Sequence, residues 1–520
     1  MPPLTPKPTS HRTWLPGFLI ANALLKFPLL PLNTGEYTDG ILQLEVFTIK
    51  SGLYPPLYGA LAWCLQSLSI DAETAGRLVS IFASILTVIP IYFLGRIFAG
   101  KNAAIYAALL FTLSPIALRW TPRVMTDSLF LLLGTSSMYY VAVAAHALNI
   151  HTGNRARQQL VRALPLASLF AALATLTRYQ GILILPLLAI VFLMFLRRYK
   201  RLPLPLLLTA LPWLLVPAWM FLGGFVHTQQ FTDRTAQELS ATLLAYWNNF
   251  ESFVLISPYY FGYPVMALAV YGMTRGTRAH PNRTLWFHLP WIALTLMLLA
   301  LQSMFGSFQY RYMMPALPYF LVLAGSALAT LERNAISIPS ITRRYIYKTS
   351  LYGTVVFCLL FAMAVLLLQR QAFQDQKESA RWIAENLPPE TRVFSNEQYG
   401  SFTSLGSVKM QFWLGRKAHM LSDPSRPDGI SQLAPGDLVA LGSYYSGEGS
   451  IAPAYQALTT RYRLQPIGPH FESTLTPLMD DIMSRGLYNQ NPIGWVMRYT
   501  PQNFYTRLFL VDNILNPVGL

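Results

Sequence analysis

The chain alternates long apolar runs with short polar segments, and this pattern predicts a bundle of membrane-spanning helices. A helix needs about 20 apolar residues to cross a bilayer, with a range of about 17 to 25. The runs that approach or reach this length predict eleven spans, at approximately residues 14–32, 74–98, 103–119, 126–148, 163–177, 180–196, 203–224, 256–273, 285–305, 312–331 and 347–368.

A further apolar stretch, YPPLYGALAWCLQSLSI at 54–70, would reverse the side of every later loop if it crossed the membrane. The basic residues decide between the two topologies, because short cytoplasmic loops collect Lys and Arg. With eleven spans and a cytoplasmic N-terminus, every basic cluster falls on one side. We therefore interpret 54–70 as an interfacial or re-entrant helix opened by Pro55 and Pro56. The residues on the cytoplasmic side are Lys7, Arg12, Arg96, Lys101, Arg155, Arg157, Arg162, the segment 197–201, Arg275, Arg278, Arg283, Arg333, Arg343, Arg344 and Lys348.

The N-terminus has an alternative interpretation as a cleaved signal peptide, because Lys7 and Arg12 precede an apolar run that contains Ala21 and Ala23. The run continues through Leu30, which favours a span that is retained.

Residues 371–520 differ from the rest of the chain in carrying more charge and only short apolar runs, such as GDLVALG and RLFLVDN. An amphipathic helix is expected to open this part and to end before Pro388 and Pro389. We predict a transmembrane domain over 1–370 and a soluble α/β domain over 371–520, which lies outside the cytoplasm after eleven spans. The fold class is thus a polytopic α-helical membrane protein with a C-terminal extracytoplasmic α/β domain.

Composition agrees with a membrane protein and excludes an ordinary soluble one, since 53% of residues are apolar, 12% are charged and the mean hydropathy is +0.36. The formal net charge of +16 is explained by topology, so nucleic acid need not be a partner. The two cysteines, Cys64 and Cys358, lie in apolar runs without metal-ligand spacing. They indicate neither a disulfide framework nor a zinc site, and the sequence identifies no cofactor.

The informative residues are the charges that the positive-inside rule leaves unexplained, all on the predicted extracytoplasmic side. Several adjoin apolar segments, where an ionised group is costly unless it is paired or faces water. Each has a simpler explanation. A carboxylate at the start of a helix, such as Asp127, stabilises the helix by its interaction with the positive end of the helix dipole. Lone arginines extend toward lipid headgroups, and turn-prone loops carry acidic residues for solubility. Arg178 and Arg311 each precede a tyrosine, which makes a shared anionic ligand more plausible. The candidates are Glu36, Asp39, Arg123, Asp127, Arg178 and Arg311.

Five short segments, taken in order, resemble the GT-C superfamily of integral-membrane glycosyltransferases, in the branch of the protein mannosyltransferases and the aminoarabinose (lipid A) transferases. They are EYTDG after the first span, YPPLYGAL, PRVMTDSLF, TRYQGILILP and QYRYMMPALP. The resemblance covers nearly the whole chain. The sequence departs from the family where Gly40 follows Asp39, in place of a second acidic residue, and where Tyr54 replaces a lysine of the aminoarabinose branch.

The resemblance implies transfer of a hexose or pentose from a polyprenyl-phosphate donor to an acceptor hydroxyl, outside the plasma (inner) membrane. The acceptor is a protein, lipid or glycan. Asp39 is the expected base of an inverting reaction, with Glu36 and Asp127 as further catalytic residues. The donor phosphate is expected to bind arginines, because a guanidinium stays charged and binds phosphate oxygens bidentately. The expected phosphate ligands are Arg178, Arg311 and Arg123, the lining residues are Tyr54, Tyr179 and Tyr312, and no metal ligand is assigned.

Two alternatives remain at the level of sequence. A lipid flippase or transporter also has many spans and few ionisable groups, although its coupling residues usually lie near the midplane within repeated halves. No repeat is detected here, and the charges lie at one face. An oligosaccharide ligase that uses a diphosphate-linked donor is the second alternative, and a comparison of monophosphate and diphosphate donors would distinguish it.

Overall fold

The computed structural model describes residues 14–49, 54–150, 154–199, 211–222, 239–279, 281–304, 310–337, 340–397, 407–421, 433–443, 450–475 and 502–515. Lys7, Arg12, Lys200 and Arg201 from the predicted cytoplasmic clusters lie outside these residues. The chain divides into two compact units. Unit 1 comprises Met1–Leu30, Lys50–Val365 and Met479–Pro492, and unit 2 comprises Pro31–Ile49, Leu366–Leu478 and Ile493–Leu520.

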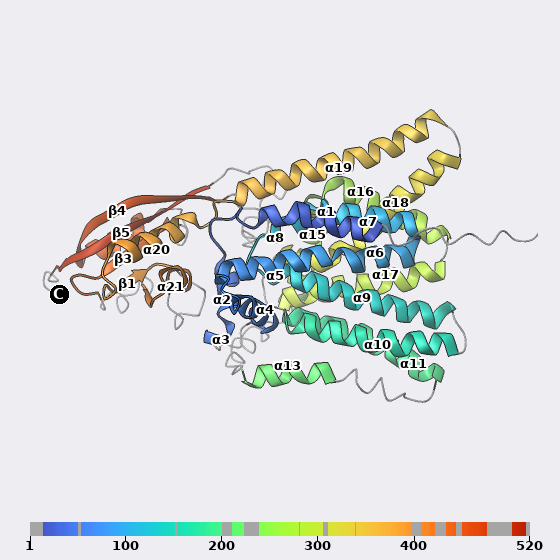
Figure 1. The fold of residues 1–520 in the computed structure, drawn as a ribbon, viewed down its shortest axis with the longest axis horizontal. Helices are drawn as coiled ribbons and strands as arrows, with labels where there is room; N and C mark the ends of the chain where they lie inside the picture. Colours follow the sequence, from blue (N-terminus) through green and yellow to red (C-terminus); the bar gives the residue numbers. More distant parts are fainter. Residues whose placement is uncertain are drawn as a thin grey trace, which may run out of the picture. The chain divides into compact units, whose positions relative to one another are not determined.

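The regular secondary structure among the described residues of unit 1 is entirely helical (Figure 1). Its elements in chain order are α1 (Trp14–Lys26), η1 (Phe27–Leu29), α4 (Leu57–Gln66), α5 (Ala72–Leu86), α6 (Val88–Ala99), α7 (Lys101–Thr112), α8 (Pro115–Trp120), α9 (Asp127–Ile150), α10 (Asn154–Thr175), η2 (Tyr179–Ile184), α11 (Leu185–Tyr199), α13 (Leu211–Leu222), α15 (Leu239–Phe261), α16 (Tyr263–Ala279), α17 (Pro281–Met304), η3 (Tyr310–Ala316), α18 (Leu317–Ser337) and, up to Val365, α19 (Ile341–Gln369).

The predicted polytopic α-helical architecture is confirmed at a coarser level than eleven spans. Six described helical segments are long and apolar enough to cross a membrane, and a seventh is a pair of helices bent by 113°. They are Ala72–Ala99, Asp127–Leu148, Tyr179–Tyr199, Phe287–Met304, Tyr310–Ser337, Ile341–Asn386 and the pair Thr242–Phe261 with Tyr263–Thr274. The count of eleven stays a prediction.

The local sequence explains one difference between the predicted spans and the observed helices. The apolar run 103–119 is divided into α7 and α8, because Ser114 caps the second helix by accepting a hydrogen bond from the Ala117 amide and Pro115 begins it. The stretch 54–70 likewise forms only the ten-residue α4, which begins after Pro56. Ten residues are too few to span a bilayer, and the interfacial or re-entrant placement of this helix stays a prediction.

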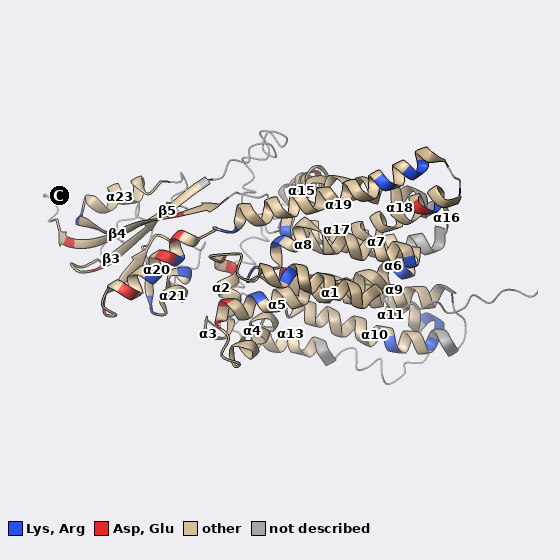
Figure 2. Ribbon diagram, turned by 45° about the horizontal axis from the view of Figure 1, so that its top comes forward, with Lys and Arg blue, Asp and Glu red and all other residues tan. Residues whose placement is uncertain are grey.

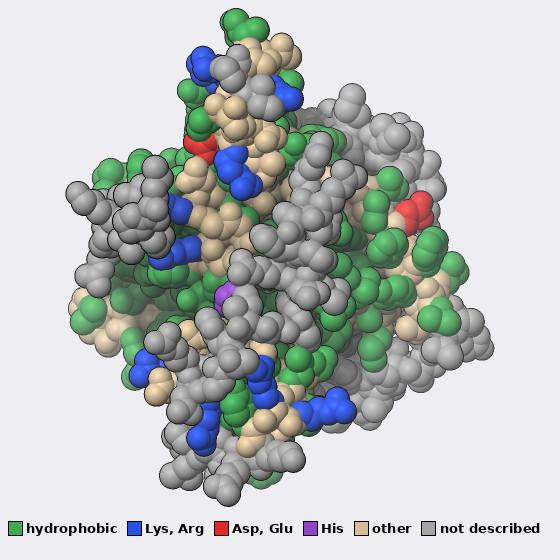
Figure 3. Space-filling model, turned by 90° about the vertical axis from the view of Figure 1, so that its right-hand side faces the viewer, with side chains coloured by type: hydrophobic (Ala, Val, Ile, Leu, Met, Phe, Trp, Pro, Cys, Tyr) green, Lys and Arg blue, Asp and Glu red, His purple; other side chains and the backbone are tan. Residues whose placement is uncertain are grey.

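Basic residues lie at both ends of the helices of unit 1. Figure 2 shows some near α5 and α8 at one end, and others at the ends of α6, α10, α11 and α19 at the opposite end. Figure 3 shows the same end face on, with Lys and Arg side chains among apolar ones. The clustering at the latter end is the one that the positive-inside pattern requires, and the side of the membrane that this end faces stays a prediction.

Unit 2 contains a five-stranded sheet with the order β2-β1-β3-β5-β4. Strand β1 pairs in parallel with β2 and β3, whereas β5 pairs antiparallel with β3 and β4. The predicted opening helix is confirmed as α20, which ends at Asn386, and GDLVALG and RLFLVDN contribute to strands as expected. The elements are α2 (Thr38–Leu44), α3 (Val46–Ile49), α20 (Gln374–Asn386), β1 (Val393–Ser395), α21 (Val408–Leu414), β2 (Ala418–Met420), β3 (Leu438–Gly442), α23 (Ala452–Thr459), β4 (Tyr462–Leu475) and β5 (Gln502–Ile514).

The central strand β3 is buried on both faces of the sheet. Val439 and Leu441 belong to a core cluster that includes α23, and Leu438 and Ala440 belong to another that includes α20 and α21. Alternate residues of a strand point to opposite faces, so helices on both sides exclude water from the sheet.

Candidate active site

Asp127 opens α9 and is the buried carboxylate of the candidate site. Its Oδ1 lies 2.5 Å from Nη1 of Arg178, which forms an ion pair with it. Its Oδ2 is also buried and has no hydrogen-bond partner among the residues that the structure describes. The helix-start explanation therefore accounts for only part of its role, because the carboxylate also has a specific charged partner and one free oxygen.

Arg178 precedes η2, and its backbone is held at the end of α10. Its amide donates to the Ala174 carbonyl at 2.8 Å, and its own carbonyl accepts from the Gly181 amide at 2.9 Å. A Cβ at Gly181 would lie 2.4 Å from the Thr175 nitrogen, so only glycine permits this close approach of η2 to α10. The sequence TRYQG thus directs Arg178 away from its helix end and toward Asp127.

Arg311 and Tyr312 enter the site from η3. The centre of the Tyr312 ring lies 4.7 Å from Cζ of Arg178 and 5.2 Å from Cζ of Arg311, both within range of a cation–π contact. Nη2 of Arg311 also donates to the Tyr312 hydroxyl at 3.4 Å. Tyr312 therefore holds both guanidinium groups, and Arg311 is itself buried.

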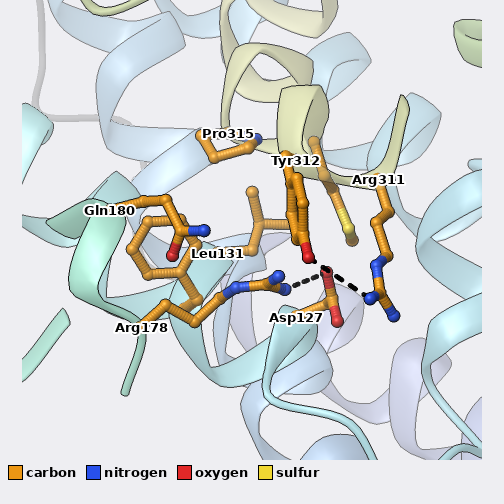
Figure 4. Close-up of a pocket in the computed structure, with 9 residues that line it drawn as sticks. Asp127, Leu131, Arg178, Gln180, Arg311, Tyr312 and Pro315 are labelled. Carbon is orange, nitrogen blue, oxygen red and sulfur yellow. Dashed lines mark hydrogen bonds and ion pairs between the residues drawn. The ribbon is translucent and has the colours of Figure 1, made fainter. Parts of the chain in front are cut away.

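These side chains line one pocket, in which Arg178, Arg311 and Tyr312 converge around Asp127 (Figure 4). Two guanidinium groups and one carboxylate leave a formal charge of +1, which suits an anionic ligand. The full lining is Asp127, Phe130, Leu131, Arg178, Gln180, Arg311, Tyr312, Met314 and Pro315.

An apolar pocket adjoins the charged one and shares part of its wall. The shared residues are Phe130, Leu131, Gln180 and Pro315, and the remainder is mainly apolar: Gly134, Thr135, Met138, Ile184, Trp291, Leu294 and Leu298. A ligand with an anionic head and an apolar tail would match the two pockets together.

The segment YPPLYGAL supports the charged pocket from outside it. The Leu57 amide donates to the Leu176 carbonyl at 2.9 Å, close in sequence to Arg178. The hydroxyl of the buried Tyr58 lies 3.1 Å from Ser80 Oγ, which in turn donates to the Met125 carbonyl, just before Asp127. The sequence analysis missed this role of Tyr58. The feature that could have indicated it is a side chain with a hydroxyl group directly after the Pro-Pro-Leu element.

Aromatic side chains of α15 pack against the start of η3. The ring centres of Tyr260 and Tyr310 lie 4.2 Å apart, and the Tyr310 hydroxyl donates to the Phe253 carbonyl at 3.0 Å and also bonds to Ser257. Tyr310 is completely buried and anchors η3, so it positions the adjacent Arg311.

Other predicted site residues lie elsewhere. Arg123 is buried and Tyr54 is half-buried, and neither lines the charged pocket. Tyr179 also does not line it. Their roles stay predictions.

The acidic residues of the first loop belong to unit 2. Glu36 is fully buried and Asp39 is half-buried in the first turn of α2. Among the described residues, no group of three or more His, Cys, Asp or Glu side chains has the arrangement of a metal site.

Residues 54–221 match the family described as dolichyl-phosphate-mannose-protein mannosyltransferase. ArnT from Cupriavidus metallidurans bound to undecaprenyl phosphate has a similar structure, with 15% identity, a TM-score of 0.58 and coverage of 88% of this chain and 96% of that one. For ArnT in the apo state the values are 12%, 0.60, 95% and 98%.

The archaeal oligosaccharyltransferase AglB from Archaeoglobus fulgidus, in complex with an inhibitory peptide and a dolichol-phosphate, gives 12% identity and a TM-score of 0.54. This alignment covers 86% of the present chain and 71% of AglB. Comparison with curated protein sequences gives no match.

The fold is that of the membrane glycosyltransferases of the GT-C superfamily, and the resemblance predicted from the sequence is confirmed. Within that class, the family match over 54–221 is mannosyltransferase-like.

Proposed function

We propose that this protein is a glycosyltransferase that moves a sugar from a polyprenyl-phosphate carrier to an acceptor hydroxyl at the extracytoplasmic face of the plasma membrane. The observation that carries the proposal is the pocket in which the guanidinium groups of Arg178 and the buried Arg311, together with one carboxylate, adjoin an apolar cavity. The matched family and the ligands named for ArnT and AglB support the same class of donor.

The reaction forms one bond and breaks one. The acceptor oxygen bonds to the anomeric carbon of the donor, and the bond between that carbon and the phosphate oxygen breaks. The electron pair leaves with the phosphate, and the hydroxyl proton moves to a carboxylate that acts as general base. Asp39 is the proposed base, and attack from the face opposite the phosphate inverts the anomeric configuration.

Arg178 and Arg311 would stabilise the negative charge that grows on the departing phosphate. A guanidinium donates two parallel hydrogen bonds to phosphate oxygens, and burial strengthens this interaction. Tyr312 keeps the two groups in place before the donor binds, so little reorganisation is required. Asp127 would hold Arg178 through Oδ1 and accept a hydrogen bond from a sugar hydroxyl through Oδ2.

The adjoining apolar pocket would receive the first isoprene units of the carrier. Its mainly apolar lining offers few polar contacts to a nucleotide or to a free sugar phosphate. The proposed donor is therefore a lipid-linked sugar. Residues outside these two pockets would bind the sugar and the acceptor.

The test is reconstitution of the purified protein in liposomes with a polyprenyl-monophosphate sugar and a mixed extract of membrane lipids, glycans and proteins as acceptors. Release of free polyprenyl phosphate by the wild type, with near loss in Asp39→Asn, is expected. Release only from a diphosphate-linked donor would indicate an oligosaccharide ligase instead. Movement of the donor across the bilayer without release would indicate a flippase.

A further inference from the structure

The backbone of the acidic first loop lies directly on the segment 370–373 of the same unit. The amide and the hydroxyl of Thr34 both donate to the Arg370 carbonyl, each at 2.9 Å. At Gly35, an added Cβ would lie 2.8 Å from the carbonyl oxygens of Ala372 and Phe373. No residue other than glycine fits this contact without moving the backbone. The main chain of the loop therefore packs directly against the main chain of residues 370–373.

Side chains extend this contact into the interior of unit 2. The Tyr37 and Phe373 rings meet edge to face with centres 5.1 Å apart, and Lys409 Nζ lies 3.5 Å from the centre of the Phe373 ring. All three side chains are buried. An ammonium group at this distance from an aromatic face gives a cation–π contact, which is stronger when it is shielded from water.

Phe373 adopts an unusual backbone conformation to make these contacts. Its φ of +61° lies in the left-handed region, which costs a non-glycine residue on the order of 1–3 kcal/mol. It is the residue immediately before α20. The surrounding structure maintains this conformation, and the ring is thereby turned toward both Tyr37 and Lys409.

Lys409 is itself fixed at the start of α21. Its amide donates to the Glu397 carboxylate, which also accepts from Ser407 Oγ at 2.6 Å. The charges that face its ammonium group are those of Glu397 and Asp375. The Asp375 Oδ2 accepts from Thr506 Oγ1 of β5 at 2.8 Å, so the ammonium group is tied to the sheet through its neighbours.

The side chains of Lys409, Phe373 and Tyr37 form a stack, and Tyr37, at one end of it, determines where α2 begins. The Tyr37 carbonyl accepts hydrogen bonds from the amides of Gly40 at 3.0 Å and Ile41 at 3.2 Å. These bonds form the first turn of α2, which contains Asp39. A shift of Tyr37 would therefore move the Asp39 carboxylate with it.

We propose that Lys409 and Phe373 are positioning residues that act through Tyr37 to hold the Asp39 loop in its working conformation. This inference rests on the proposed function for its consequence in sugar transfer. It assigns the α/β unit a role in positioning the proposed base.

The experiment compares Lys409→Met, Phe373→Leu and the wild type by hydrogen–deuterium exchange of the full-length protein without substrate. Methionine keeps an apolar stem without charge, and leucine keeps apolar volume without a ring. About tenfold faster exchange is expected at the amides of residues 37–44, with β4 and β5 unchanged. In the transfer assay kcat should fall about 100-fold while the KM for the donor is unchanged, since misplacement of a catalytic group by about 1 Å has this effect.

Arg392→Met is the matched control, because it removes an ion pair of the same unit, in which the exposed Arg392 lies 2.6 Å from the buried Asp437. It should leave the loop amides as in the wild type. Equal acceleration in this control, or unchanged loop exchange in both stack variants, would overturn the proposal. If Lys409→Met fails to fold, Phe373→Leu provides the same comparison with Lys409 in place.

The exchange measurement needs no substrate, so the two proposals fail separately. Faster loop exchange in the stack variants supports the positioning role even if the wild type releases no polyprenyl phosphate, and only the proposed function then fails. Wild-type transfer combined with unchanged loop exchange in both variants would leave the proposed function intact and remove the stack from the mechanism.

Discussion

Asp127 and Arg178 form a buried ion pair between the start of α9 and the turn before η2, with Oδ1 and Nη1 2.5 Å apart. Burying two charges is costly, and a buried pair is often no more stable than an apolar replacement. The pair holds the Arg178 guanidinium in one orientation and leaves Oδ2 of Asp127 without a hydrogen-bond partner among the described residues.

Asp127→Asn should disable transfer and also destabilise the protein. The amide keeps the shape of the carboxylate but leaves the Arg178 charge without its partner, which costs about 3–5 kcal/mol for a buried pair. We expect kcat to fall about 100- to 1,000-fold, as for loss of one preorganised charge contact. Thermal unfolding and the transfer assay measure the two effects.

The double variant Asp127→Asn with Arg178→Met separates the effect on stability from the effect on transfer, because it removes both charges together. It should regain much of the lost stability and none of the activity. Recovery of transfer in the double variant would show that the pair has only a structural role.

Arg311→Lys should weaken binding of undecaprenyl phosphate by about 10-fold, because lysine keeps the charge but loses the two parallel hydrogen bonds of a guanidinium. Arg311→Met should weaken it further. Titration of the reconstituted protein with undecaprenyl phosphate measures the affinity. Arg333→Met, at an exposed position of α18, is the control, and equal affinity in all three variants would exclude Arg311 from the donor site.

Gly35→Ala should reduce transfer strongly with little change in donor affinity. Its Cβ would meet the carbonyl oxygens of Ala372 and Phe373 at 2.8 Å, so the loop that carries Asp39 must move. Gly353→Ala in α19 is the matched control, since its Cβ would meet nothing within 4 Å. If the two variants have the same kcat, the seating of the loop does not matter to the reaction.

Lys409 should make stability depend on pH. Burial lowers the pKa of its ammonium group from 10.5 to about 8, although Glu397 and Asp375 favour the charged form. Between these values the unfolded chain binds more protons than the folded one, so this group makes the free energy of unfolding rise with pH from about 8 to about 10.5. Lys409→Met lacks that contribution.

The comparison of wild type and Lys409→Met by thermal unfolding tests this sign. The free energy of unfolding of the methionine variant minus that of the wild type should be highest below pH 8 and should fall as the pH rises toward 10.5. A difference that stays constant over this range would show that the buried amine does not titrate there.

The sequence predicted much of the charged pocket but little of its support. Asp127, Arg178 and Arg311 were recognisable because charges at the ends of apolar runs are costly, and this signal needs no knowledge of contacts. The partners of Tyr58 come from different helices, so no local pattern identifies them.

The burial of two lysines could not be predicted from the sequence either. Lys26 lies within the first apolar run, which predicts a span, and it is fully buried there, where its Nζ donates to Ser84 Oγ at 2.9 Å. Lys409 appears in the sequence as an ordinary charge of a soluble domain. Only the folded chain reveals that Phe373 and two carboxylates surround it.

The contact between Thr34 and Arg370 joins positions 336 residues apart, and this has a consequence for biosynthesis. At roughly 5–20 residues per second, a ribosome needs about 17–67 s to make the intervening chain. During that interval the acidic loop has left the ribosome without the carbonyl that anchors it. A nascent chain that stops before Arg370 therefore has no means to adopt the described loop conformation, so this part of the molecule matures only after nearly all the helices have been synthesised.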